Sequence, residues 1–196
     1  MSEQPTGELE YRTATVLGTS FPDRIIELIV MPYEAETVAD YKGRMIHEVV
    51  HRGAFDGIER RANRIRVNRD HDVTRTVGRA VRLHPSRTEG LVAELRIAKT
   101  PLGDETLELA DEEILDASAG FLPMPGGERW ENRDMRHLDR LWLGHIAMTP
   151  EPAYQDARVL SVRSAGLTEP PGGISTPNIE QVYAWRAQDL YDRLSR

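Results

Sequence analysis

Cysteine is absent from the 196-residue sequence, and other common features are scarce. Without cysteine the chain cannot form a disulfide, bind zinc through thiolates or use a cysteine nucleophile. No apolar run approaches the roughly 20 residues of a membrane-spanning helix, so we expect no membrane association. The first ten residues, MSEQPTGELE, are polar and acidic, and we do not interpret them as a signal peptide.

The sequence also lacks an excess of positive charge. It has 25 lysines and arginines and 32 acidic residues, so its net charge is −7. This balance argues against a protein whose main role is to bind nucleic acid. One stretch departs from it, since residues 58–87 hold nine arginines and three acids. That stretch is either a solvated arginine-rich face or a surface that meets an acidic partner.

Short segments rich in β-branched and apolar residues predict many strands and few helices. We expect strands at 11–18, 25–33, 43–50, 65–68, 76–83, 90–97, 114–121, 135–138 and 141–148. Short helices are expected at 56–63 and 104–113. This pattern favours an α+β, mainly β fold, with a largely antiparallel barrel or sandwich decorated by helices.

The composition changes after this strand-rich part. Residues 1–163 are predicted to form one domain, and residues 164–177 are a linker rich in proline and glycine. Residues 178–196 have apolar positions near one stripe and predict an amphipathic C-terminal helix.

Ser118 stands in ILDASAGF, where small neighbours leave room for another chain to lie against it. A serine hydroxyl is a weak nucleophile until a base takes its proton and a third group orients that base. Two histidines are candidates for these roles: His71, between two acids at a strand edge, and His145, in an apolar strand. Taken singly, each histidine is better explained as a structural residue with a satisfied hydrogen bond than as a catalyst.

The segment His47-Glu48-Val49-Val50-His51 matches the H-E-x-x-H motif of zinc peptidases. The Val-Val pair and the nearby Gly53 favour a strand instead of the helix that this motif needs. On a strand, residues four apart are about 13 Å from each other, too far to share one zinc ion. We therefore expect no metal and no cofactor, and keep a zinc peptidase as an alternative.

Several short motifs occur in a fixed order along residues 11–162 and resemble the prohead maturation proteases of tailed bacteriophages. They are GAF (53–55), N-x-x-H-D with a following glycine (Asn68, His71, Asp72, Gly78), G-L (Gly90, Leu91), S-x-G-F (Ser118, Gly120, Phe121) and P-A (Pro152, Ala153). The resemblance implies the fold of the herpesvirus assembly proteases, an antiparallel β-barrel surrounded by helices.

The resemblance also implies roles for individual residues. Ser118 matches the nucleophile of the family and His71 its general base. Many relatives carry a glutamate where this chain has His145, so the resemblance here is to the Ser–His–His arrangement of the herpesvirus enzymes. Asp70, Asp72 and Glu113 remain alternatives for the third position, and the stretch 133–140 is the place to look for oxyanion donors.

These assignments predict a serine endopeptidase that matures phage proheads. Its substrates would be scaffold protein or a scaffold-like segment of the major capsid protein, and also the protease itself. The resemblance implies a homodimer that acts inside the prohead in the host cytoplasm, or is encoded by a prophage, and that binds neither nucleic acid nor membrane. A non-catalytic capsid-assembly scaffold module is the remaining alternative.

Overall fold

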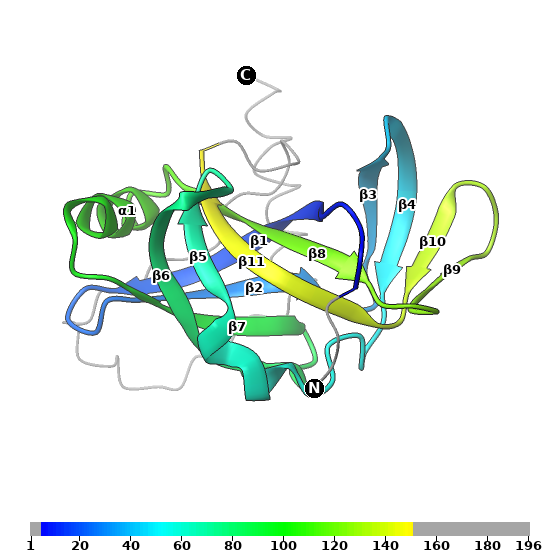
Figure 1. Ribbon diagram of the computed structural model, residues 1–196, viewed down its shortest axis with the longest axis horizontal. Coiled ribbons are helices and arrows are strands. Elements are labelled where there is room, and N and C mark those ends of the chain that lie inside the picture. The colour runs from blue at the N-terminus through cyan, green and yellow to red at the C-terminus, as the bar shows by residue number, and fades with distance from the viewer. Residues whose placement is uncertain (1–4, 151–196) are drawn as a thin grey trace, which may run out of the picture. The chain divides into compact units, whose positions relative to one another are not determined.

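The computed structural model describes residues 5–150, which form a closed β-barrel with a second, smaller sheet beside it (Figure 1). The barrel strands are β1 (Glu10–Ser20), β2 (Ile25–Pro32), β5 (Arg66–Arg69), β6 (Asp72–His84), β7 (Gly90–Ile97), β8 (Asp116–Pro123) and β11 (Leu141–Thr149). The second sheet holds β3 (Glu36–Tyr41), β4 (Arg44–Val50), β9 (Glu128–Trp130) and β10 (Met135–Leu138). The predicted linker 164–177 and helix 178–196 lie outside the described residues, as does the end of the predicted domain 1–163.

The barrel closes in the order β1-β2-β7-β6-β5-β11-β8. Its neighbours are antiparallel except for β5 and β11, which run in parallel. The prediction of an antiparallel barrel is therefore wrong at this pair. The reason is arithmetical: strand directions cannot alternate all the way around a ring of seven, so at least one pair must be parallel.

Alternation along the strands separates a barrel core from an outer face. On β8, for example, Ala117, Ala119 and Phe121 belong to the core, so Ser118 and Gly120 point to the outer side. The mainly β prediction is confirmed, with a closed barrel as its centre.

Two helices are present in the described part of the chain: the α-helix α1 (Pro101–Asp111) and a 3-10 helix, η1 (Ile58–Arg64). The side chain of Thr100 caps α1 by accepting a hydrogen bond from Gly103 N, and Pro101 occupies the first turn, where its missing N–H is not needed. Both helices overlap the predicted ones. The ring of helices expected around the barrel is not seen within residues 5–150, where none of the helices is long and apolar enough to cross a membrane.

Strand β3 was not among the expected strands. It pairs with β4 in antiparallel register, from Glu36 opposite Val49 to Tyr41 opposite Arg44. β10 pairs with the other edge of β4 in parallel, which brings residues 135–138 beside 47–50. The pairing of β4 with β10 thus joins distant segments of the chain, and local sequence patterns do not reveal it.

Candidate active site

Ser118 lies on the outer face of the barrel, near the middle of β8. It stands opposite Thr13 of β1 on one side and Ala147 of β11 on the other. The serine is 0% exposed, and its Oγ has no hydrogen-bond partner. A buried hydroxyl without a partner loses the stabilisation that water would give it, so this position has a cost in folding free energy.

His71 is held at the tip of the hairpin between β5 and β6. Arg69 pairs with Asp72, so Asp70 and His71 form a two-residue turn. Both have positive φ, 56° and 58°, as a type I′ turn requires at its two central positions. Glycine and asparagine are preferred there, and a histidine in this conformation is uncommon. The turn fixes the direction in which the imidazole projects.

His145 reaches the outer face through an irregularity in β11. The register with β8 shifts between Leu143 and His145, so that Leu143 and Ile146 both lie in the core while His145 stands opposite Gly120. The imidazole ring covers Gly120: a methyl group there would lie 2.8 Å from His145 Cε1. Glycine at this point of the S-x-G-F motif is what makes space for the ring.

The two histidines hydrogen-bond to each other, with His71 Nδ1 and His145 Nε2 2.8 Å apart. The ring of Tyr11 packs against both, with its centroid 4.3 Å from that of His71 and 6.0 Å from that of His145. Since His71 uses Nδ1 in this bond, its Nε2 is left to receive a proton from a nucleophile, as in a Ser–His–acid triad.

Burial sets the protonation of the pair. Desolvation, and to a lesser degree the charge of His145, lower the pKa of His71 from 6.5 to about 4. Desolvation also lowers the pKa of His145. At neutral pH both rings are therefore uncharged, so one nitrogen of the bonded pair donates and the other accepts.

This lowered pKa predicts an unusually acid-tolerant activity. A base must be neutral to accept a proton, so cleavage should persist as the pH falls from 7 to 5 and be lost as it passes below about 4, the pKa of His71. The measurement is kcat/KM against pH, which reports the pKa values of the free enzyme. An acid limb centred at 6.5, the usual histidine value, would contradict the assignment of a buried His71 as base.

The serine is not joined to the histidine pair by a hydrogen bond, because Ser118 Oγ has no partner. Ser118 and Gly120, which His145 covers, are two residues apart and share a face of β8, which separates them by about 7 Å. The structure thus gathers the three predicted residues on one patch and forms one of the two hydrogen bonds that the predicted triad needs. Catalytic hydrogen bonds are often long before substrate binds.

Two of the three carboxylates considered for the third position, Asp70 and Asp72, have other partners. Asp70 Oδ2 accepts from Arg75 at 2.6 Å, and Asp72 Oδ1 accepts from the backbone and hydroxyl of Thr74. Among the described residues, His145 is the side chain that hydrogen-bonds His71.

The stretch 133–140 lies in β10 and its flanking turns, on the second sheet. Arg136 is buried there and ion-pairs with Glu10 and Glu128. β8 has a strand on each side, so its amides are used in barrel ladders. The residues that bind an oxyanion are therefore not identified among these groups.

The histidines of the H-E-x-x-H segment do not converge. His47 is exposed on β4 and contacts Glu36 at 2.5 Å. His51 follows the strand and contacts Glu34 at 2.9 Å and His137 Nδ1 at 2.9 Å. Within residues 5–150 no group of three or more histidine or acidic side chains is arranged to hold a metal ion. The zinc interpretation loses its geometric basis.

Glu48, the central residue of that segment, is instead a buried ion-pair partner. It is 1% exposed and binds Arg12, with Arg136 3.7 Å away. Glu48→Ala would leave the Arg12 charge buried without this partner, and we expect a loss of about 3–5 kcal/mol in the free energy of unfolding. Glu36→Ala, which removes an exposed pair, should cost less than about 1 kcal/mol.

Chemical denaturation of the two variants measures this difference. Loss of activity in Glu48→Ala with unchanged stability, together with inhibition of the wild type by a chelator, would favour a zinc peptidase instead.

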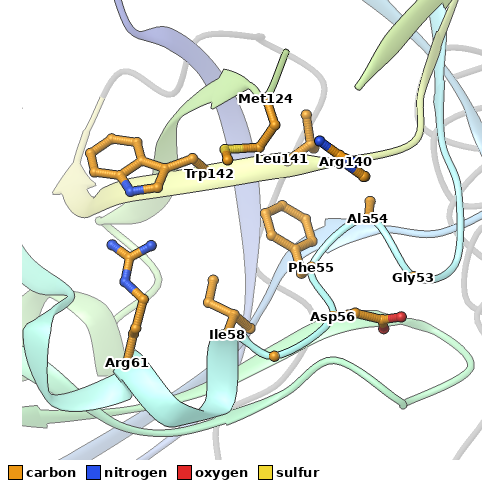
Figure 2. A pocket seen from close by; sticks show the side chains of 11 residues that line it. Gly53, Ala54, Phe55, Asp56, Ile58, Arg61, Met124, Arg140, Leu141 and Trp142 are labelled. Atoms are coloured by element: carbon orange, nitrogen blue, oxygen red, sulfur yellow. The ribbon is translucent and has the colours of Figure 1, made fainter. Parts of the chain in front are cut away.

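A pocket of about 320 Å³ opens at the start of β11 (Figure 2). Phe55 of the GAF motif, Ile58 and Met124 form apolar walls, and Figure 2 shows the Arg61 guanidinium directed at the Trp142 indole, 5.5 Å from its centroid. Burial, with a smaller effect from Arg64, lowers the pKa of Arg61. Asp56, Arg61 and Arg140 add charged groups to this lining.

Comparison with known proteins was made at the level of families, curated proteins and solved structures. The model of the caudovirus prohead serine protease family matches residues 30–169, which is most of the chain. The chain belongs to this family. No curated protein matches it, and no solved structure does.

The prohead protease match includes the GAF loop, the hairpin with His71, the β8 serine and His145. Membership makes the protein a phage serine protease of capsid maturation, with action inside the prohead. Of the residues at the site, sequence reasoning missed Tyr11 and the register shift at Gly144. A tyrosine at the start of a strand has no local signal that places it against two distant histidines.

Proposed function

We propose that the protein is a serine endopeptidase that cleaves scaffold protein, or the scaffold-like segment of the major capsid protein, and also itself. Ser118 is the nucleophile, His71 the general base and His145 the group that orients His71. The observation that carries this assignment is the 2.8 Å hydrogen bond between the two imidazoles, on the same outer face as Ser118.

In the proposed reaction, Ser118 Oγ attacks the peptide carbonyl and its proton passes to His71 Nε2. His71 Nδ1 donates to His145 Nε2 throughout, which fixes the tautomer and ring position of the base. His71 then gives the proton to the leaving amine, and water hydrolyses the acyl-enzyme by the same route in reverse. A neutral His145 stabilises the imidazolium less than a carboxylate would, so a slower enzyme is expected.

The burial of Ser118 supports control of this activity by assembly. A substrate carbonyl must reach Oγ, so the site has to open before acylation. Resemblance to the herpesvirus assembly proteases implies a homodimer, and dimer formation or enclosure in the prohead would supply that opening. The free protein in the host cytoplasm would then be slow.

Co-expression with the cognate major capsid protein tests the proposal. Wild type should shorten the capsid protein, and Ser118→Ala should leave it at full length. Ser86→Ala, in an exposed loop, is the matched serine control and should process normally. Processing by Ser118→Ala would refute the serine mechanism, whereas normal capsid assembly without any processing by wild type would favour a non-catalytic scaffold module.

A further inference from the structure

Three arginines stand side by side across the outer face of the barrel. Arg66 of β5 pairs with Arg79 of β6, which pairs with Arg96 of β7. All three side chains are exposed. We call these residues the arginine row. Like charges directly opposite each other on neighbouring strands are destabilising, so the fold gains nothing from this arrangement.

The arginine row lacks counter-charges. Within residues 5–150 none of its three members forms an ion pair, and Arg66 donates only to the backbone oxygen of Asn63. Farther along the same two strands the charges are balanced, because Arg82 of β6 binds Glu94 of β7 at 2.9 Å. The absence of partners is therefore a property of this row and not of the whole face.

A groove of about 530 Å³ follows the row and adds further positive charge. Arg24 and Lys99 line it together with the three arginines, and no acidic residue lines it. Asp104, which pairs with Arg24 at 2.6 Å, neutralises that one cation. Four cations without a partner carboxylate among residues 5–150 thus line one groove.

The row continues directly from the candidate active site. Arg66 stands opposite His145 on β11, and His145 stands opposite Gly120 on β8. From His145 to Arg96 there are three strand-to-strand steps, about 14 Å in total. A helical segment of about ten residues has that length.

We propose that the arginine row is a docking site for an acidic helical segment of the polypeptide substrate, close in sequence to the scissile bond. This inference rests on the proposed function. Neighbouring strands place the arginines about 4.8 Å apart. Carboxylates at i and i+4 on a helix are about 5–6 Å apart and match this spacing. Nucleic acid is the less suitable occupant, because a chain with net charge −7 repels it outside the groove.

Binding to defined probes tests the docking site, with Ser118→Ala as the host so that nothing is cleaved. The probes are an alanine-based 20-residue peptide with glutamate at every fourth position, the same peptide with lysine, and a 20-nucleotide DNA. The glutamate peptide should bind best, and the variant R66Q/R79Q/R96Q should bind it about tenfold more weakly. The control Arg82→Gln, on the same strand, should change binding less than about twofold.

Added salt should remove most of the difference, since exposed charges are screened within about 10 Å at 0.1 M. The triple variant should melt at the wild-type temperature or above it, because it relieves like-charge contacts. Arg79→Glu alone should weaken binding more than Arg79→Gln. Equal binding of the glutamate peptide to host and triple variant, or tighter binding of the DNA or lysine probe, would overturn the proposal.

Cleavage of the capsid protein separates this inference from the proposed function. On an active background the triple variant should raise KM with kcat nearly unchanged, while Ser118→Ala abolishes turnover. An unchanged KM in the triple variant would refute the docking site and leave the serine protease intact. Turnover by Ser118→Ala would refute the serine mechanism and leave the peptide-binding result standing.

Discussion

His71→Ala is expected to reduce kcat about a million-fold, whereas His145→Ala should reduce it by about a hundred- to ten-thousand-fold. The difference follows from their places in the hydrogen-bond chain. Loss of His71 removes the proposed acceptor of the serine proton. Loss of His145 leaves His71 in place but removes the 2.8 Å hydrogen bond at its Nδ1. The ring orientation and the tautomer of His71 are then no longer fixed by that bond.

Single-turnover cleavage of the capsid protein by each variant measures the two effects. His47→Ala is the control, because His47 is exposed on the second sheet and contacts Glu36. Its activity should equal that of the wild type. Equal losses of activity in His71→Ala and His145→Ala would contradict the separate roles of base and orienting group. Full activity of His145→Ala would show that His145 is not part of the active site.

The pH profile gives an independent readout for His145. Its charge contributes, after burial, to the lowered pKa of His71. His145→Ala should therefore move the acid limb of kcat/KM toward the usual histidine value. Loss of the ring also lets water reach His71, and burial is the larger cause of its lowered pKa, so both effects move the limb in this direction.

The sequence predicted most strands of the barrel, because alternation of apolar and polar residues is a local property. It did not predict which strands pair. The parallel contact of β5 with β11 joins residues 66–69 to 145–148, and no local pattern specifies that contact. It matters for the site, since it places the hairpin that carries His71 beside the strand that carries His145.

The conformation of His71 was not predictable for a different reason. Asp-His is a poor sequence for a two-residue turn with positive φ at both positions, and local rules favour a longer loop. Uncommon backbone conformations persist where the surrounding fold over-determines them, and they cluster at functional sites. The disagreement between sequence rule and structure at residues 70–71 is thus itself a pointer to the site.

The buried ion pair of Glu48 is a third feature that the sequence did not predict. Glu48 lies in a motif that suggests chemistry, yet it binds Arg12 in the interior. A buried carboxylate has no sequence signature, because its partner comes from a strand far away in the chain. The H-E-x-x-H pattern alone is therefore weak evidence for a metal site.

A single methyl group at Gly120 is expected to disable the enzyme without replacing any member of the proposed triad. The added carbon would lie 2.8 Å from His145 Cε1 and 3.2 Å from both ring nitrogens. The ring has to move, because contacts this short are repulsive. Its movement breaks the hydrogen bond with His71, so Gly120→Ala should reduce kcat by about a hundred-fold or more.

A double-mutant cycle distinguishes this effect from a general disturbance of β8. If Gly120→Ala acts through His145, the double variant with His145→Ala should be no slower than His145→Ala alone, since neighbouring residues with one shared function are not additive. Additive losses would show that the methyl group harms the site by another route. Retention of wild-type kcat in Gly120→Ala would show that the position of the His145 ring does not limit catalysis. His145 would then not be the group that orients His71.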